Sequence, residues 1–181
     1  MRVITGKARG VQLKTPEGMT TRPTTDRVKE ALFSIIHFEI PGASVLDLFG
    51  GTGQLGIEAL SRGAKRAVFV DSQDSACRLI RENLTRAKMQ QDGQVVRSDY
   101  LQYLDRCREK FDIILLDPPY AEVFLENALK RITEIDILES NGIIVAERPL
   151  GKELPWEFEG YTRSKDYKYG KILLTIYRKA E

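Results

Sequence analysis

The sequence predicts a single α/β domain built around a doubly wound, seven-stranded and mostly parallel sheet. Between residues 44 and 147, short apolar segments alternate with segments of helical periodicity. The apolar segments, of which Ile113–Leu116 is the clearest, lack polar alternation, as is typical of parallel strands covered on both faces. A glycine-rich turn at Gly50–Gly53 follows the first segment, a placement common in sheets that bind a ligand at the carboxyl ends of their strands. A length of 181 residues suits one such domain.

The N-terminal part of the chain is expected to form a small extension of this domain. Residues 2–13 have the pattern of a short β-hairpin that turns at Gly6 and Gly10. Thr24 or Thr25 can then cap a helix that runs to about His37. We therefore divide the chain into residues 1–41, the hairpin and helix, and residues 42–181, the main domain, which we expect to form one structural unit.

The main domain is predicted to alternate strand and helix and then to end in an antiparallel hairpin. A sheet of this kind resembles the class I methyltransferase fold, whose last strand inserts antiparallel to the others. The hairpin is expected because two strand-like segments flank a turn at Gly170. The expected strands cover residues 44–49, 67–71, 95–97, 111–117, 142–147, 161–167 and 172–177, and the expected helices cover residues 56–61, 75–88, 101–107 and 123–133.

Composition excludes several classes of protein. The two cysteines, Cys77 and Cys107, have no metal-ligand spacing, and His37 is the only histidine, so neither a multi-histidine zinc site nor a metal of any kind is expected. No run of 18 apolar residues occurs, and the first ten residues lack the apolar core of a signal peptide. We expect a cytoplasmic protein with reduced thiols and no membrane contact, which acts as a monomer.

The glycine-rich turn is compatible with two kinds of cofactor. Glycines at these positions let the backbone bend tightly and approach a ligand closely. Gly51, Gly53 and Gly56 also satisfy the spacing of a dinucleotide site, and Asp71 follows Gly51 by 20 residues, as that motif requires. A NAD-dependent oxidoreductase therefore remains an alternative at this point.

Acidic residues at three strand ends favour S-adenosylmethionine over a dinucleotide. Asp47 lies just before the glycine turn, where a carboxylate can hold the cationic amino-acid end of S-adenosylmethionine but would repel a pyrophosphate. Asp71 can accept hydrogen bonds from both ribose hydroxyls, and Asp99 can accept one from the adenine amine. The alternative, that each acid only caps the following helix, is weaker for three successive strand ends than for one.

The segment Asp117-Pro-Pro-Tyr120 supplies the candidate catalytic residues at the end of the fourth main-domain strand. The two prolines stiffen the loop and leave the carbonyl of Pro118 free to point at a substrate. This carbonyl and the Asp117 carboxylate form two acceptors, which match the two protons of an exocyclic NH2 group on a nucleic-acid base. Tyr120 can stack on that base. The alternative is an ordinary turn without catalytic function.

Basic residues are concentrated at the two ends of the chain. Residues 1–30 carry a net charge of +4, whereas the whole chain carries +2. A second basic cluster, between residues 161 and 179, is interleaved with tyrosines. Basic groups neutralise phosphates and aromatic rings stack on bases, so both clusters are candidate RNA or DNA surfaces. Solvated strand edges protected by lysine are the alternative.

Four segments closely resemble the RsmD family of bacterial 16S rRNA guanine-N2 methyltransferases. The resemblance runs nearly from end to end, and its segments are Arg2-Val-Ile-Thr-Gly6 with Gly10, Arg22–Phe33, Leu46–Gly53 with Gly56–Gly63, and Asp117–Tyr120. It implies methylation of the guanine amine at position 966 during small-subunit assembly, with 16S rRNA in the subunit or in an assembly intermediate as the partner. Three positions depart from the family pattern: Gly50 replaces Ala or Ser, Asp71 replaces the common Glu, and Gly170-Lys-Ile172 replaces Gly-Asp-Thr.

The motifs and the resemblance together give the expected site residues. The catalytic residues are Asp117, Pro118 and Tyr120. The residues expected to bind S-adenosylmethionine are Arg22, Thr24, Thr25, Asp47, Phe49, Gly50, Gly51, Thr52, Gly53, Asp71, Ser72, Asp99 and Tyr100. Those expected to bind RNA are Arg2, Lys7, Arg9, Arg27, Lys29 and Lys168.

Three other functions compete with this interpretation. A DNA adenine-N6 methyltransferase uses the same chemistry, although 181 residues leave no room for a separate target-recognition domain. A protein glutamine methyltransferase also uses such a loop, usually with Asn in place of Asp117. A catalytically silent RNA-binding assembly factor would not need the intact Asp117 and Tyr120.

Overall fold

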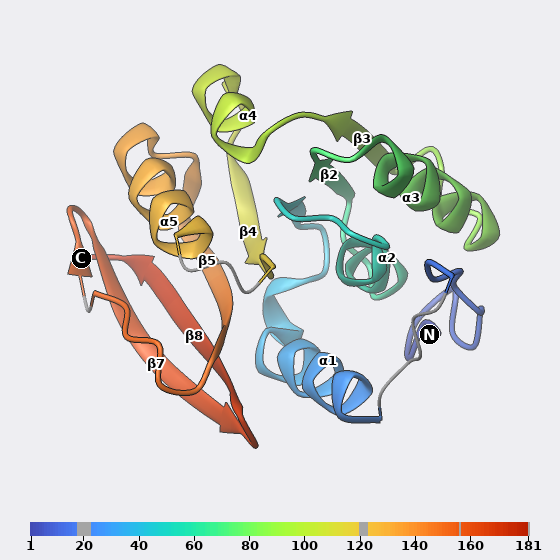
Figure 1. The fold of residues 1–181 in the computed structure, drawn as a ribbon, viewed down its shortest axis with the longest axis horizontal. Helices are drawn as coiled ribbons and strands as arrows, with labels where there is room; N and C mark the ends of the chain where they lie inside the picture. Colours follow the sequence, from blue (N-terminus) through green and yellow to red (C-terminus); the bar gives the residue numbers. More distant parts are fainter. Residues whose placement is uncertain (18–22, 120–122, 156, 181) are drawn as a thin grey trace.

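The protein forms an eight-stranded sheet with helices on both faces (Figure 1). The computed structural model describes residues 1–17, 23–119, 123–155 and 157–180, with only the backbone of residues 23–25. The strand order is β3-β2-β1-β4-β5-β8-β7-β6, in which β1 to β5 are parallel and the last three are antiparallel to their neighbours. The strands are β1 (Ser44–Asp47), β2 (Arg66–Asp71), β3 (Gly93–Arg97), β4 (Phe111–Leu116), β5 (Leu138–Pro149), β6 (Glu157–Phe158), β7 (Tyr161–Tyr169) and β8 (Ile172–Lys179).

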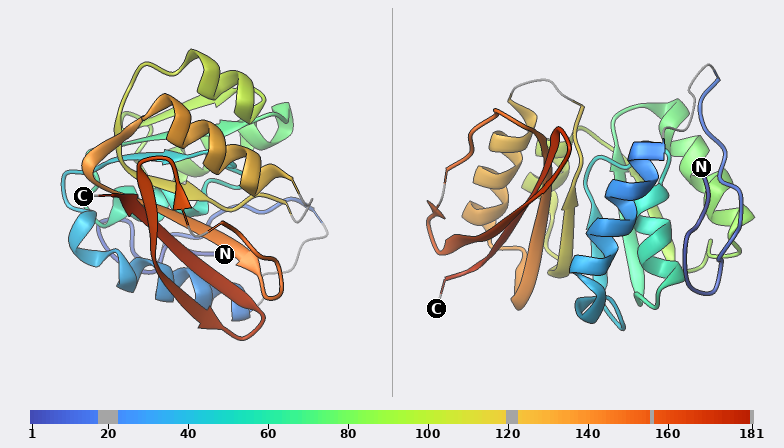
Figure 2. Two further views of the ribbon diagram at one scale, coloured as in Figure 1. Left: turned by 90° about the vertical axis from the view of Figure 1, so that its left-hand side faces the viewer. Right: turned by 90° about the horizontal axis from the view of Figure 1, so that it is seen from below.

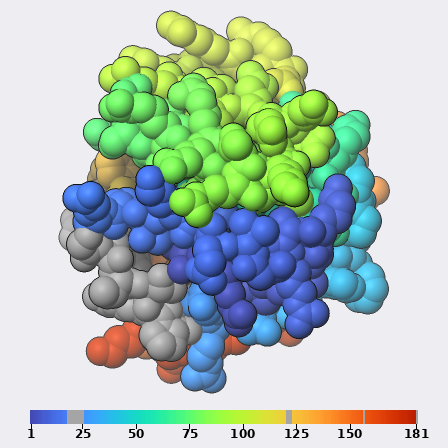
Figure 3. All heavy atoms as spheres, turned by 90° about the vertical axis from the view of Figure 1, so that its right-hand side faces the viewer, coloured from blue at the N-terminus to red at the C-terminus, as the bar shows by residue number. Residues whose placement is uncertain are grey.

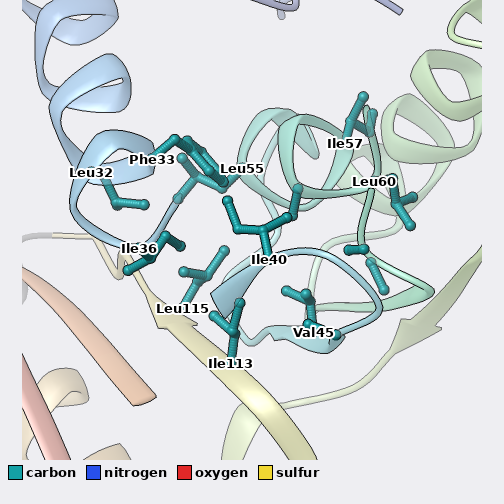
Figure 4. Close-up of a cluster of buried hydrophobic side chains, with 14 of the residues drawn as sticks. Leu32, Phe33, Ile36, Ile40, Val45, Leu55, Ile57, Leu60, Ile113 and Leu115 are labelled. Carbon is teal, nitrogen blue, oxygen red and sulfur yellow. The ribbon is translucent and has the colours of Figure 1, made fainter. Parts of the chain in front are cut away.

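Two hydrophobic cores separate the sheet from its helices. On one face α1, α2 and α3 cover a core centred on residues such as Phe33, Ile57 and Leu115 (Figure 4). On the other face α4 and α5 cover a core that contains Leu104, Leu129 and other buried side chains. The α-helices are α1 (Pro23–Ile35), α2 (Gln54–Ser61), α3 (Asp74–Arg86), α4 (Tyr100–Arg106) and α5 (Phe124–Ile135), and a 3-10 helix spans His37–Glu39.

The expected α/β architecture is confirmed, and the differences lie at element ends. β8 inserts between β5 and β7, antiparallel to both, as the predicted C-terminal hairpin requires. The two-residue strand β6 adds an eighth strand, which is too short to produce a sequence periodicity. β5 begins at Leu138, four residues before the expected start, because Leu138 pairs with Phe111 and both are buried.

The N-terminal extension differs more from its prediction. Residues 2–13 form a single bridge between Arg2 and Gln12 rather than a regular hairpin. The helix α1 begins at Pro23, so neither Thr24 nor Thr25 is its N-cap, and it ends at Ile35 rather than near His37. Proline is favoured as the first helical residue because its φ angle already suits a helix and its missing N–H needs no partner there.

Residues of α2 and α3, rather than regular strand pairing, anchor the N-terminal segment. The Glu58 carboxylate accepts hydrogen bonds from the backbone N–H groups of Ile4 and Thr5, at 2.9 and 3.0 Å. Gly6 has a φ of +96°, and a side chain there would lie 1.9 Å from the carbonyl oxygen of Ser61. Asn83 of α3 bonds the backbone of Lys14 in both directions. Figure 3 shows residues 1–17 lying against the α3 side of the molecule, and Figure 2 shows the β7–β8 hairpin on the opposite side.

Candidate active site

The loop between β1 and α2 brings the glycine-rich turn to the carboxyl edge of the sheet. Gly51 and Gly53 have φ angles of +59° and +84°, which side chains disfavour. Gly50 has no such angle, but a Cβ there would lie 2.7 Å from Cδ1 of Ile80. The backbone N–H of Gly51 donates to Oδ2 of Asp71 at 2.9 Å. This hydrogen bond fixes the turn against the end of β2.

Asp47 is a buried carboxyl group with one unsatisfied oxygen. Its side chain is 1% exposed, and its Oδ2 accepts a hydrogen bond of 3.2 Å from the backbone N–H of Gly56. Oδ1 has no hydrogen-bond partner among the described residues. Burial, and then the negative charges of Asp117 and Asp71, raise the pKa of Asp47 to about 8. A buried acceptor of this kind is expected to be satisfied by a ligand that brings a donor or a positive charge.

A cavity of about 1150 Å³ opens beside these residues. Seven of the residues predicted to bind the cofactor line it. They are Phe49, Gly51, Thr52, Asp71, Ser72, Asp99 and Tyr100. Gly50, Gly53 and Asp47 are not among the lining residues. Arg22 and the side chains of Thr24 and Thr25 lie outside the described part of the chain.

Asp71 and Asp99 both cap local structure and face the cavity. Oδ1 of Asp71 accepts a hydrogen bond from the backbone N–H of Gln73, while its Oδ2 accepts the bond from Gly51. Oδ2 of Asp99 accepts from the backbone N–H groups at the start of α4, at 3.0 and 3.2 Å. A carboxylate oxygen has two lone pairs, so capping leaves acceptors for a ligand. Helix capping and cofactor binding, the two roles considered for these acids from the sequence, are therefore compatible.

Several lining residues were missed from the sequence. Phe124 at the start of α5 contacts Tyr100 edge to face, with ring centroids 5.3 Å apart, and Tyr100 contacts Phe49 at 5.1 Å. The N-terminal segment adds further lining residues, namely Lys14, Thr15, Pro16 and Glu17. They lie far from the glycine turn in the sequence, and no local pattern marks them. The cavity thus has an apolar aromatic side and a polar rim.

The Asp117-Pro-Pro segment leaves β4 at the edge of this cavity. Pro119 lines the cavity, and Asp117 lies directly after the last residue of β4. Burial raises the pKa of Asp117, and a hydrogen bond with Glu147 of β5 lowers it. Glu147 was not predicted as a site residue, because it lies 30 residues away in a segment without a motif. Tyr120 lies outside the described residues, so its position relative to the cavity stays a prediction.

Five of the six basic residues predicted to bind RNA have exposed side chains. They are Arg2, Lys7, Arg9, Arg27 and Lys168. The prediction for Lys29 is wrong, because its side chain is 2% exposed and its ammonium group pairs with Glu58 at 3.2 Å. The same group donates to the backbone carbonyl of Arg2. Lys29 therefore holds the N-terminal segment and does not face solvent.

The described residues contain no group of three or more side chains that could hold a metal ion. Within the same residues, no helix has the length and apolar character needed to cross a bilayer.

The strand order, the reversed β8 strand and the cavity beside the glycine turn define a class I S-adenosylmethionine-dependent methyltransferase. The chain belongs to the family described as Conserved hypothetical protein 95, which it matches over residues 1–178. The Bacillus subtilis protein YlbH, named as a candidate rRNA methyltransferase, is 41% identical over 99% of both chains. Ribosomal RNA small subunit methyltransferase D of Escherichia coli is 30% identical over 99% of this chain and 90% of its own.

Solved structures agree with this assignment. A structure of the Escherichia coli protein yhhF, titled as a candidate methyltransferase, superposes with a TM-score of 0.89. The two chains are 31% identical, and the match covers 100% of this chain and 99% of the other. The resemblance to the RsmD family found in the sequence is therefore confirmed at the level of the family.

Proposed function

We propose that the protein transfers a methyl group from S-adenosylmethionine to the N2 amine of guanine 966 in 16S rRNA during small-subunit assembly in the cytoplasm. The observation that carries this proposal is the position of Asp117 directly after β4, two residues before Pro119, which lies in the cavity wall. The motif suits any exocyclic amine. The choice of small-subunit rRNA is supported by the relative named Ribosomal RNA small subunit methyltransferase D. The choice of guanine follows from the resemblance to the RsmD family.

In the proposed reaction, Asp117 and Pro118 hold the amine. The carboxylate and the Pro118 carbonyl each accept one N–H, which turns the nitrogen lone pair out of conjugation and toward the methyl group. The N–C bond forms as the S–C bond breaks, and the proton that the nitrogen loses passes to the Asp117 carboxylate. Tyr120 is proposed to stack on the base, which contributes about 1–3 kcal/mol toward the cost of flipping it out.

The proposed cofactor contacts follow from the groups at the strand ends. The buried, unsatisfied oxygen of Asp47 suits the cationic amino-acid end of S-adenosylmethionine. Asp71 and Asp99 line the cavity and have lone pairs left for the ribose hydroxyls and the adenine amine. The rings of Phe49, Tyr100 and Phe124 form an apolar wall for the adenine. We further propose that Arg22, Thr24 and Thr25 contact the cofactor, as the family resemblance implies.

Replacement of Asp47 with Asn is expected to stabilise the free protein and weaken cofactor binding. The pKa of Asp47 in the folded chain, about 8, exceeds its unfolded value, so the free energy of unfolding falls as pH rises from about 4 to about 8. Because Asn does not ionise, the variant should not show this fall in the free energy of unfolding. The substitution also removes the charge that holds the cofactor, so we expect affinity for S-adenosylhomocysteine to fall by at least about 10-fold.

Urea unfolding at pH 5 and pH 8, together with calorimetry, would measure both effects of the Asp47→Asn change. If the variant binds S-adenosylhomocysteine more weakly but is no more stable than the wild type at pH 8, the energetic cost that we assign to the buried Asp47 carboxylate is contradicted. An unchanged Kd would contradict the assigned contact. Asp112→Asn is a suitable control, because Asp112 caps the backbone N–H of Ser44 at the opposite end of the strands.

The substrate class can be tested by supplying labelled S-adenosylmethionine with three nucleic acids. These are small subunits from a strain that lacks the protein, protein-free 16S rRNA, and adenine-containing duplex DNA. We expect label in rRNA and none in DNA. Label in DNA would favour the adenine-N6 alternative, and calorimetry that detects NAD binding without S-adenosylhomocysteine binding would favour an oxidoreductase.

Charge reversal of Arg9 is expected to weaken RNA binding. The side chain is exposed on the N-terminal segment, where the net charge is most positive. Each phosphate contact that is lost should reduce the slope of log K against log salt by about 0.7–0.9. Arg9→Glu and the control Arg106→Glu, on the exposed end of α4, should be compared across a salt series. Equal slopes for the two variants would show that Arg9 does not contact the RNA.

A further inference from the structure

Glu147 lies beside Asp117 at the carboxyl end of the neighbouring strand. β4 and β5 pair in parallel, with Leu115 opposite Val145 and Leu116 opposite Ala146. The next residues in this register are Asp117 and Glu147. Side chains alternate along a strand, so both carboxyl groups lie on the face that carries Leu115 and Val145, which is the face covered by α1. The strand register therefore brings a second acid to the proposed catalytic carboxylate.

The two acids share a hydrogen bond, and this bond requires one proton. Two neighbouring carboxylates in a desolvated site cannot both be ionised without strong repulsion. Burial, followed by the charge of Asp117, raises the pKa of Glu147 to about 8. Burial also raises the pKa of Asp117, but the hydrogen bond with Glu147 acts in the opposite direction and lowers it. The charge and hydrogen bond of Asp117 raise the pKa of Glu147, whereas the same hydrogen bond lowers the pKa of Asp117, so we assign the shared proton to Glu147 and the acceptor role to Asp117.

The surroundings of the pair contain no compensating positive charge in the described residues. On β8, the residue opposite Glu147 is Leu174, which is fully buried. On β1, the acid is Asp47, whose pKa is raised first by burial and then by the charge of Asp117. On α1, the ammonium group of Lys29 is paired with Glu58. No described basic group contributes to the pKa shift of Asp117 or Glu147.

We propose that neutral Glu147 is a positioning residue, which donates a hydrogen bond to one oxygen of Asp117 and leaves the other oxygen to accept from the substrate amine. This inference rests on the proposed function, because it assigns Asp117 to the amine. Without the donor, Asp117 would rotate more freely. If Glu147 were ionised, its charge would repel Asp117 and disturb the pair. Glu147 thus orients the Asp117 carboxylate for the amine without contacting the methyl group itself.

The pH dependence of kcat provides the test, with small subunits from a strain lacking the protein and saturating S-adenosylmethionine. For the wild type, we expect kcat to fall as pH rises through about 8, when Glu147 loses its proton. Glu147→Gln keeps a donor at every pH, so it should lose this fall and retain at least about a third of kcat at pH 7. Glu147→Ala should lower kcat by about 10- to 100-fold, with KM for the subunit and Kd for S-adenosylhomocysteine unchanged.

Two controls separate positioning from structural loss. Glu139→Gln changes an exposed acid on the same strand and should keep both kcat and the wild-type pH profile. Carboxyl NMR without substrate should show the pKa of Glu147 falling in Asp117→Asn, because a negative neighbour has been removed. Loss of the Asp47 proton favours binding of a cationic cofactor and should raise activity as pH rises. Loss of the Glu147 proton should lower activity, so the two titrations can be told apart by their direction.

Either of two results would overturn the inference: a Glu147→Gln profile that falls like the wild type, or a Glu147→Ala variant with wild-type kcat. An unchanged pKa for Glu147 in Asp117→Asn would also overturn it. If the wild type methylates no subunit at any pH, the proposed function fails instead. The NMR titration still decides whether the carboxyl pair exists in that case.

Discussion

Asp117→Ala is expected to reduce methyl transfer by about 100-fold or more while leaving affinity for S-adenosylhomocysteine unchanged. Asp117 follows β4 at the cavity edge, and its role in the proposal is to hold the amine and accept its proton. Loss of the side chain removes both functions at the reacting nitrogen. The cofactor contacts come from other strand ends, so binding should persist. Single-turnover rates and calorimetry on the same preparations would measure the two effects.

Asp117→Asn is the matched variant for this prediction. The amide keeps a carbonyl acceptor of the same size but cannot take up the proton, so an intermediate rate is expected. Full activity in the alanine variant would show that Asp117 has no role in methyl transfer. A parallel loss of rate and of cofactor affinity would mean that Asp117 supports the cavity rather than the amine.

Glu58→Ala is expected to lower the free energy of unfolding by about 3–5 kcal/mol. Glu58 has no exposed surface, and its carboxylate pairs with Lys29 at 3.2 Å and with Arg62 at 2.9 Å. It also binds the backbone N–H groups of Ile4 and Thr5. Removal leaves a buried ammonium group without its carboxylate and two backbone donors without acceptors, which is costly at such depth.

An exposed ion pair gives the comparison for Glu58. Glu82 pairs with Lys14 at 3.0 Å, but the two side chains are 45% and 54% exposed. Glu82→Ala should therefore cost less than about 1 kcal/mol. Equilibrium urea unfolding of both variants would measure the difference. Similar losses for the two variants would contradict the structural role assigned to Glu58 and Lys29.

The parallel sheet was predictable because its strands are buried on both faces. Segments such as Ile113–Leu116 are apolar without alternation, and a glycine turn fixes where β1 ends. The N-terminal segment was not predictable in the same way. It is held by the carboxylate of Glu58 and the amide of Asn83, contacts that span 53 to 69 residues. Local periodicity in the sequence does not reveal contacts between residues this far apart. A regular hairpin was therefore expected for this segment.

The positions of the candidate site residues were predictable where the topology brings motifs together. Parallel strands end at one edge, so Asp71 and Asp99 were expected near the glycine turn, and both line the cavity. Glu147 and Phe124 could not be found, because only strand register and helix packing bring them to this edge. Lys29 was assigned to the surface because its burial depends on a partner in another helix.

The most direct measurement of the central claim is the position of the labelled methyl group in 16S rRNA. Small subunits from a strain lacking the protein should be methylated in vitro, and the rRNA should then be digested and analysed by mass spectrometry. We predict one methyl group per rRNA, on N2 of guanine 966, with no label when Asp117→Ala replaces the wild type. A methyl group on an adenine amine, on another nucleotide, or on protein alone would contradict the account.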